Sequence, residues 1–184
     1  MSTVETLYTE LDSDIFNALS EIKLLVCDID GVFSDGRIYL GNDGEELKAF
    51  HTRDGYGVKA LINCGVEVAV ITGRRSAIVQ QRMQSLTVKY IVQGQENKAD
   101  AIQELINTLG LTTRQVASVG DDMPDIGMFN HSTIRIAVND AHPFVARNAN
   151  WVTEHRGGFG AVREIADTIL QAHGRLEEQH GASV

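Results

Sequence analysis

The sequence predicts an α/β fold, a Rossmann-like and mostly parallel sheet sandwiched by helices. Three observations predict it. Short apolar segments alternate with segments of helical length, the strand-like segments are apolar throughout, and no Pro/Gly/Ser-rich linker interrupts the 184 residues. Continuous apolar strands are typical of parallel sheets that are covered on both faces. A chain of this length forms one domain with a substantial core.

The first half of the chain predicts a helix, a strand, a hairpin, a second helix and a second strand. A polar segment favours the first helix, and the apolar run after it favours a strand. The triplet Asn42-Asp43-Gly44 has hairpin-turn chemistry, because these residue types tolerate positive φ. The later strand is rich in β-branched residues. In order, these elements lie over residues 12–20, 22–27, 37–40 with 46–51, 55–63 and 66–71.

The second half continues the alternation of helices and strands. Pro124 favours a short helix directly after it, since proline suits the first turn of a helix. The helices are expected over residues 76–85, 98–109, after 124 and over 161–173, and the strands over 88–92, 116–119, 134–137 and 151–152.

The organisation along the chain follows from these elements. We expect a helical N-terminal extension over residues 1–20 and one main domain over residues 21–173. A short hairpin flap over about residues 36–51 follows the first core strand of this domain. Residues 174–184 form a polar C-terminal tail that frays.

Composition excludes several classes of partner. The formal net charge is −9 and no basic tract offsets it, which argues against nucleic acid and an anionic membrane surface. No apolar run has the length of a membrane span, and the polar N-terminus lacks the apolar core of a signal peptide. A cytoplasmic location is therefore expected. If the substrate is anionic, basic side chains have to gather locally inside an acidic protein.

Polar residues follow three of the predicted core strands. The carboxyl ends of parallel strands meet at one edge of a sheet, and ligands bind there. We therefore expect these residues to converge on one site. They are Asp28-Ile29-Asp30-Gly31, Thr72-Gly73-Arg74, Lys98 at the start of a helix, and Gly120-Asp121-Asp122 with Asp125.

This combination of residue types predicts phosphoryl transfer. Several carboxylates on one edge require a cation, and Mg²⁺ suits carboxylate, phosphate and water oxygens. Asp28 can attack phosphorus and form an aspartyl-phosphate. Asp30 can protonate the leaving alcohol and then deprotonate water. Thr72 and the amide after it can bind the phosphoryl oxygens, while Lys98 neutralises their charge.

Each of these residues also has an ordinary structural interpretation. An Asp-x-Asp pair is often only a turn, Thr-Gly commonly opens a loop, and Asp122 before Pro124 suits a helix N-cap. A phospho-receiver domain is the mechanistic rival, because it carries similar groups on strand ends. Its acidic pair precedes the acceptor, however, whereas Asp121 and Asp122 follow here, and a second Asp would hasten loss of the phosphate. An enzyme is favoured.

The chain resembles the haloacid dehalogenase superfamily of phosphohydrolases. The motifs that carry the resemblance are Asp28-Ile29-Asp30-Gly31-Val32, Thr72, Lys98, and Gly120-Asp121-Asp122 with Asp125. It implies that Asp28 is the nucleophile and Asp30 the general acid and base. It also implies that Asp28, the main-chain carbonyl of Asp30, and Asp121 hold the Mg²⁺ ion, with Asp122 and Asp125 supporting them.

Further segments are similar to the family of 3-deoxy-D-manno-octulosonate 8-phosphate phosphatases. This resemblance implies release of phosphate and the free sugar acid Kdo during lipopolysaccharide biosynthesis in a Gram-negative cytoplasm. It also implies a fold without a cap domain and a homotetramer joined by its hairpins. The two departures are His51, where asparagine is expected, and an N-terminal stretch that does not align with the family. The matching segments are residues 34–36, 44–50, 53–57, 141–143 and 157–164.

A sugar acid phosphate carries a carboxylate as well as a phosphate, so one cation is not enough to bind it. Arg74 directly follows the Thr72 segment and Arg82 lies about two turns along the next helix, so both are expected at the mouth of the cleft. Arg53 and Lys59 follow the hairpin and are candidates that reach a neighbouring subunit. The full expected substrate-binding set is Asp30, His51, Thr52, Arg53, Asp54, Gly55, Lys59, Gly73, Arg74, Arg82 and Lys98.

Two alternatives stay open from the sequence. The catalytic residues handle only the phosphate, so the substrate could be another sugar acid phosphate, such as one with nine carbons. The second alternative is an assembly or regulatory module that keeps the fold without turnover. The presence of Asp28, Asp30, Lys98 and Asp121 counts against this second alternative.

Overall fold

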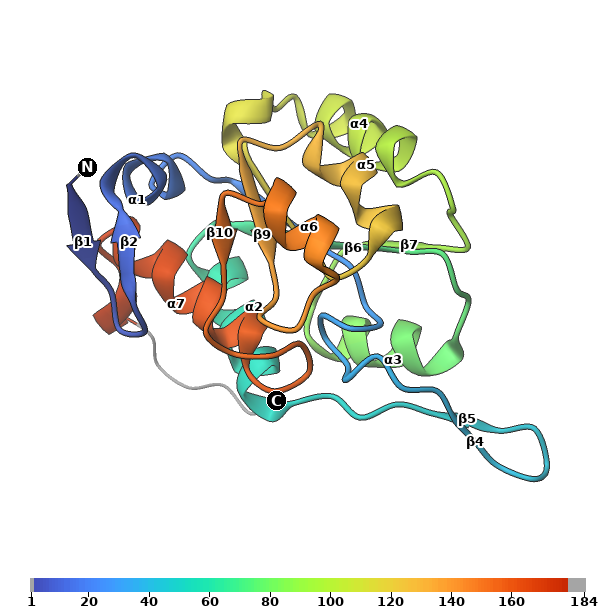
Figure 1. Ribbon diagram of the computed structural model, residues 1–184. Coiled ribbons are helices and arrows are strands. Elements are labelled where there is room, and N and C mark those ends of the chain that lie inside the picture. Colours follow the sequence, from blue (N-terminus) through green and yellow to red (C-terminus); the bar gives the residue numbers. More distant parts are fainter. Residues whose placement is uncertain (1, 179–184) are drawn as a thin grey trace.

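A parallel sheet forms the centre of the molecule (Figure 1). The structure is a computed structural model and describes residues 2–178. Within these residues, six strands pair in the order β10-β9-β8-β3-β6-β7, and every pairing is parallel. The predicted fold class is confirmed. The strands are β3 (Leu24–Cys27), β6 (Glu67–Thr72), β7 (Tyr90–Gln93), β8 (Val116–Gly120), β9 (Ile134–Ala137) and β10 (Trp151–Val152).

Helices cover both faces of this sheet (Figure 1). Leu24 and Val26 of β3 pack on one face and Leu25 and Cys27 on the other, as the alternation of a strand requires. The first face is covered by α4 (Lys98–Leu109) and α5 (Ile126–Phe129). The second face is covered by α2 (Thr52–Asn63), α3 (Ala77–Ser85) and α7 (Ala161–Ala172).

Most predicted helices and strands are present, with small shifts at their ends. α4 has the predicted bounds, and Gly110 with φ 64° ends it in the left-handed conformation that favours glycine. α2 begins earlier than predicted, at Thr52, and His51 caps it. α6 (Pro143–Asn148) was not predicted, although His142 caps it and proline occupies its first turn. Among residues 2–178, no helix combines the length and apolar character needed to cross a bilayer.

The N-terminal extension is more than the helix that the sequence predicts. α1 (Ser13–Leu19) is present, but an antiparallel hairpin of β1 (Thr3–Glu5) and β2 (Glu10–Asp12) precedes it. The hydroxyl of Tyr8 at its turn donates to Oδ2 of Asp167 in α7 at 2.6 Å. The strands were missed because three residues each are too few to show a period. At the other end, η3 spans Leu176–Glu178, and residues 179–184 of the predicted tail lie outside the described residues.

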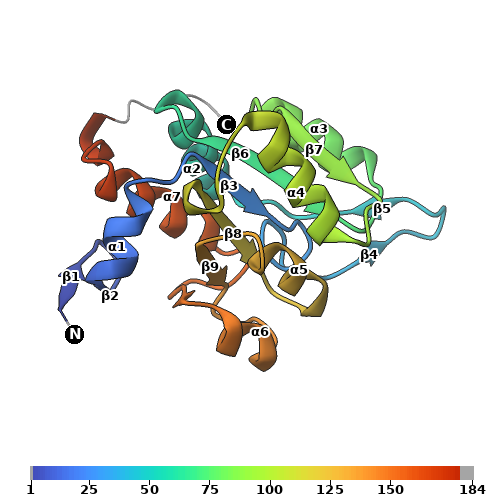
Figure 2. The ribbon, with the colours of Figure 1, turned by 90° about the horizontal axis from the view of Figure 1, so that it is seen from above.

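A second hairpin projects from the opposite end of the molecule (Figure 2). It consists of β4 (Tyr39–Leu40) and β5 (Glu46–Leu47), so its strands are shorter than predicted. Its apolar side chains Ile38, Leu40 and Leu47 are exposed, because no part of residues 2–178 covers them. The strands are short because an isolated two-stranded hairpin is only marginally stable in water. In the described chain it is the insertion between β3 and α2, and no cap domain is present.

Candidate active site

Three neighbouring strand ends form the floor of a cavity of about 560 Å³. Cys27 of β3 is paired with Val70 of β6 and with Val119 of β8, so the carboxyl ends of these strands are level. Asp28 and Asp121 directly follow their strands, and Thr72 is the last residue of β6. The cavity is lined by Asp28, Asp30, Gly36, Thr72, Gly73, Arg74, Gln95, Glu96, Lys98, Asp121, Asp122, Pro124 and Asp125.

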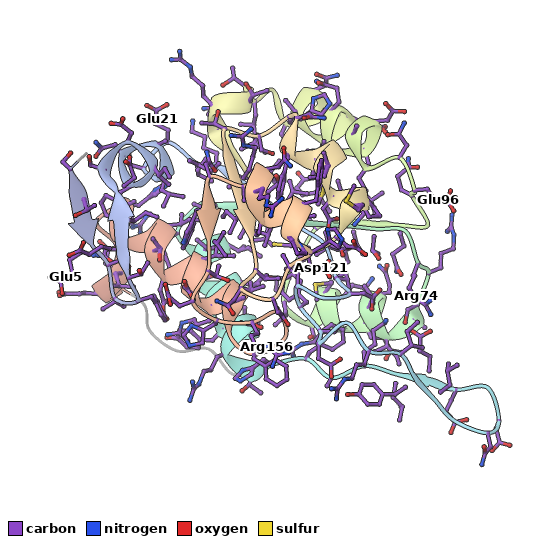
Figure 3. All side chains as sticks on the ribbon, viewed as in Figure 1. Glu5, Glu21, Arg74, Glu96, Asp121 and Arg156 are labelled. Atoms are coloured by element: carbon purple, nitrogen blue, oxygen red, sulfur yellow. The ribbon has the colours of Figure 1, made fainter. Side chains whose placement is uncertain are left out.

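The cavity extends from the middle of the molecule toward the side of the β4–β5 hairpin. Asp121 lies near the middle and Arg74 and Glu96 on the hairpin side, whereas Glu5 and Glu21 lie at the opposite end (Figure 3). The polar groups that the sequence predicts to converge are therefore brought together at the carboxyl edge of the sheet. Gly36, Gln95, Glu96 and Pro124 also line the cavity, and the sequence had singled out none of these four for the site.

Lys98 joins two of the carboxylates. Its Nζ donates to Oδ1 of Asp28 at 2.7 Å and to Oδ1 of Asp125 at 2.6 Å. The lysine is only 4% exposed. Burial lowers the pKa of Lys98, but the two carboxylates outweigh this effect and hold it above its usual value. Lys98 therefore stays an ammonium ion, fixed by the start of α4.

Asp125 supports both Lys98 and the segment after β8. Its Oδ2 accepts the backbone N–H of Asp121 at 2.9 Å and that of Asp122 at 3.2 Å. Gly120 permits this approach, since a Cβ there would lie 2.3 Å from Cβ of Asp125. Asp122 accepts from the backbone N–H of Met123 at 2.8 Å, so it is also the N-cap of the short helical turn Met123–Asp125.

The carboxylates of Asp28, Asp121 and Asp125 form a group suited to a metal ion. One oxygen from each lies within 4.8 Å of the others. Burial, then the charge of Asp125, raises the pKa of Asp28 to about 6 although Lys98 opposes the shift. Burial, then Asp28 and Asp125, raises the pKa of Asp121 to about 8. One ammonium does not balance three carboxylates, so the donor set fits a further hard cation.

The ligand set expected from the sequence differs in one member from this group. That set was Asp28, Asp121 and the main-chain carbonyl of Asp30, with Asp125 in a supporting position. In the structure both oxygens of Asp125 are already engaged, one by Lys98 and the other by two backbone amides. This bonding fits a supporting position for Asp125, even though its carboxylate lies within the group.

Asp30 and Arg74 are linked through the hairpin. Asp30 forms an ion pair with Lys48, and Nε of Arg74 lies 4.0 Å from Oδ2 of Asp30. Nη2 of Arg74 donates to Oε2 of Glu46 at 2.6 Å. Sequence reasoning gave Glu46 and Lys48 no role. Their spacing was a usable signal, because charges at i and i+2 share one face of a strand.

The other expected substrate-binding residues do not line the cavity within residues 2–178. Nδ1 of His51 accepts the backbone N–H of Arg53 at 3.1 Å and so caps α2. Asp54 is buried, and its Oδ1 accepts the backbone N–H of Arg163 in α7 at 2.9 Å. The remaining residues of this group are Thr52, Gly55, Lys59 and Arg82.

Arg82 lies apart from its expected position at the mouth of the cleft. A Cβ added at Gly55 would lie 2.5 Å from Nη2 of Arg82, so the guanidinium packs against the first turn of α2. Burial lowers the pKa of Arg82, although the charge of Asp54 opposes the shift. Arg82 differs from its expected position because Gly55 has no side chain and leaves room for the guanidinium beside α2.

The fold, with Asp28, Lys98 and Asp121 gathered at its strand ends, defines a hydrolase of the haloacid dehalogenase class. A family model described as haloacid dehalogenase-like hydrolase matches residues 90–165. The 3-deoxy-D-manno-octulosonate 8-phosphate phosphatase KdsC of Yersinia pestis is 45% identical over 98% of this chain and 97% of its own length. The enzyme of the same name from Escherichia coli K12 is 43% identical over 100% of this chain and 97% of its own length. This chain therefore belongs to the KdsC family of phosphatases.

Solved structures agree with this assignment. The crystal structure of the Yersinia pestis phosphatase has a TM-score of 0.97 and 44% identity, and covers 100% of this chain and 99% of that chain. The phosphatase of Moraxella catarrhalis, solved in complex with a magnesium ion, a phosphate ion and a KDO molecule, has a TM-score of 0.88 and 36% identity. It covers 90% of this chain and 95% of that chain.

Proposed function

We propose that this chain hydrolyses 3-deoxy-D-manno-octulosonate 8-phosphate to Kdo and inorganic phosphate, with Mg²⁺ as cofactor. The observation that carries the proposal is the cavity where Asp28, Asp121 and Lys98 meet, with Arg74 at its rim. The family relationship over the whole chain supports the choice of substrate. Phosphatases of another sugar acid phosphate share the same catalytic groups and are the second candidate.

Asp28 is the proposed nucleophile. Its carboxylate attacks phosphorus, the bond between phosphorus and the sugar oxygen breaks, and an aspartyl-phosphate forms. Asp30 gives its proton to the departing sugar oxygen. In the second step Asp30 takes a proton from water, whose oxygen attacks phosphorus and releases phosphate and the free Asp28 carboxylate. Lys98 stabilises the charge on the phosphoryl oxygens, and Thr72 and the amide of Gly73 donate hydrogen bonds to them.

Asp28, the main-chain carbonyl of Asp30, and Asp121 are the proposed ligands of Mg²⁺. The raised pKa values of Asp28 and Asp121 support this choice, because both result from burial and unbalanced negative charge. Bound Mg²⁺ would supply the positive charge that lets an anionic carboxylate approach an anionic phosphate. Gly31 has φ 94°, and a Cβ there would lie 2.0 Å from Oδ2 of Asp121, so glycine at this position lets Asp121 approach.

Arg74 is the proposed ligand of the substrate's carboxylate. Its side chain is 45% exposed at the cavity, next to the phosphate-binding segment after β6. A guanidinium matches a carboxylate with two parallel hydrogen bonds, which lysine cannot reproduce. Thr72 and Arg74 line the same cavity, so one small substrate can contact both residues.

A homotetramer is part of this proposal. Exposed Ile38, Leu40 and Leu47 on the β4–β5 hairpin support it, since pairing of hairpins between subunits would bury them and close their open edges. In such an assembly, Arg53 and Lys59 of α2 are the candidates that would reach a neighbouring subunit's cavity. A cytoplasmic location and a role in lipopolysaccharide biosynthesis also belong to the proposal.

A substrate panel with phosphate release as readout tests the proposed activity. The panel contains 3-deoxy-D-manno-octulosonate 8-phosphate, a nine-carbon sugar acid phosphate, and a hexose 6-phosphate without a carboxylate. We expect kcat/KM for the octulosonate phosphate to exceed that for the hexose phosphate by at least about 100-fold. A preference for the nine-carbon acid would favour the second candidate, and no turnover of any would favour a non-catalytic module.

A further inference from the structure

Two charged side chains of the hairpin stem reach the active site. Glu46 belongs to β5 and Lys48 follows two residues later, so both point to the same side of the chain. Oε2 of Glu46 accepts from Nη2 of Arg74 at 2.6 Å, and Nζ of Lys48 lies 3.0 Å from Oε1 of Glu46. Lys48 also pairs with Asp30, and its side chain is 0% exposed.

These contacts close a ring of alternating charge. It runs from Asp30 to Lys48, to Glu46, to Arg74, and back to Asp30 through the 4.0 Å separation between Nε of Arg74 and Oδ2 of Asp30. The neighbouring ammonium of Lys48 and the hydrogen-bonded guanidinium of Arg74 lower the pKa of Glu46, so its side chain is an anion at neutral pH. Glu46 itself is not among the residues that line the cavity. It therefore contacts the site through Arg74 and Lys48.

We propose that Glu46 is a positioning residue that holds Arg74 in place for the carboxylate of the substrate, and so determines specificity for acidic sugars. This inference rests on the proposed function. A guanidinium has five N–H donors, so Arg74 can bind Glu46 through one nitrogen and still present others to a ligand. A free arginine side chain would lose much of its rotamer freedom on binding, and fixing it beforehand removes that cost.

The anchoring of Glu46 favours positioning over competition. A carboxylate that only blocked Arg74 would have to leave when the substrate's carboxylate arrives. Glu46 is held from the other side by Lys48, which is itself buried against Asp30. The contacts thus keep Glu46 where it is and hold Arg74 at the cavity that it lines.

Kinetics of Glu46→Ala on two substrates tests this inference. The substrates are 3-deoxy-D-manno-octulosonate 8-phosphate and p-nitrophenyl phosphate, which has no carboxylate. We expect Glu46→Ala to raise KM for the acidic substrate about tenfold with little change in kcat, and to affect p-nitrophenyl phosphate much less. Glu46→Gln, which keeps the shape without the charge, should give an intermediate rise. The matched control is Glu45→Ala, since the exposed Glu45 side chain lies over Gly41 and should leave both substrates unaffected.

A double variant makes the test sharper. If Glu46 acts through Arg74, then Glu46→Ala combined with Arg74→Ala should lose no more on the acidic substrate than Arg74→Ala alone. Additive losses would overturn the inference, and so would a lower KM in Glu46→Ala or equal losses on both substrates. The substrate preference of the wild-type enzyme distinguishes a failure of this inference from a failure of the proposed function. If it prefers another sugar acid phosphate, the proposed substrate is wrong, and the same comparison on the preferred acid decides the role of Glu46.

Discussion

The ammonium nitrogen of Lys98 lies 2.7 Å from Oδ1 of Asp28, and both side chains are buried. Lys98 is the first residue of α4, and Asp28 directly follows β3, so the pair joins a helix start to a strand end. The ion pair opposes the burial that raises the pKa of Asp28 to about 6. The charge of Lys98 therefore favours the carboxylate form of Asp28, which a nucleophile requires.

Removal of the metal should abolish activity. Asp28 and Asp121 are hard oxygen ligands that repel each other without a cation, so a chelator should stop phosphate release and Mg²⁺ should restore it. Ca²⁺ should inhibit, because its larger and looser coordination shell misplaces the attacking carboxylate. Thermal unfolding gives an independent readout, since Mg²⁺ at about 100 times its Kd should stabilise the protein by about 2.7 kcal/mol. Full activity in chelator without added metal would refute a metal requirement.

Replacement of Arg74 should weaken binding of the substrate's carboxylate without affecting that of its phosphate. Arg74→Ala should lower kcat/KM for the octulosonate phosphate by about 10²-fold or more, because a charged hydrogen-bonding group of the substrate loses its partner. The loss on p-nitrophenyl phosphate should be much smaller, since that compound has no carboxylate. Steady-state kinetics on both compounds decides the matter. Equal losses would mean that Arg74 serves the phosphate or the fold.

The stability of the protein should depend on pH through Asp54. Burial raises the pKa of this carboxyl from 3.8 to about 6, although backbone amides and the charges of His155 and Arg163 partly oppose it. Since the folded state then holds the proton more tightly than the unfolded state, this contribution to stability is complete below the ordinary pKa and is lost as pH rises through about 6.

Asp54→Asn tests this dependence, because the amide does not ionise. The free energy of unfolding of the variant, taken relative to that of the wild type, should rise by on the order of 2 kcal/mol as the pH is raised from about 4 to about 7.5. Denaturant unfolding at both pH values measures it. Asp43→Asn, at the exposed turn of the β4–β5 hairpin, is the matched control. A difference between Asp54→Asn and wild type that is the same at both pH values would contradict the raised pKa.

The assembly prediction depends on the apolar side chains of the hairpin. Light scattering at micromolar concentration should give the mass of four chains for the wild type. Leu40→Asp should reduce that mass, because the side chain is 71% exposed in the single chain and would be buried between hairpins. Leu7→Asp is the control, since Leu7 is 64% exposed in the turn between β1 and β2, and that hairpin lies at the opposite end of the molecule (Figure 2). A monomeric wild type would count decisively against a tetramer.

The sequence predicts that the polar residues of the proposed active site lie together, because strand ends are predictable. Asp28, Thr72 and Asp121 each follow an apolar run. The level ends of the parallel strands bring them together, independently of the conformation of the loops. Lys98 is predicted from a different pattern, since it opens the segment of helical length over residues 98–109. These residues depend only on elements with a readable pattern.

The parts that the sequence did not predict depend on the angles between elements. The contacts of Glu46 with Arg74 and of Lys48 with Asp30 require the stem of the hairpin to lie beside the strand ends, and no periodicity encodes that placement. The bond from Tyr8 to Asp167 likewise spans 159 positions in the chain. α6 was missed for another reason, because Pro143 gave a helix-start signal that was not used.

The most direct test of the account is to trap the phosphorylated enzyme. In Asp30→Asn, p-nitrophenyl phosphate should still phosphorylate Asp28, because p-nitrophenolate leaves without a proton, while the attack of water is slowed about 10²- to 10⁴-fold. Acid quenching and peptide mass mapping should then find one phosphoryl group, on Asp28. In Asp28→Asn the group should be absent and turnover should fall by at least about 10⁴-fold, with the folded state retained. Turnover that persists in Asp28→Asn, or a phosphoryl group on a different residue, would contradict the account.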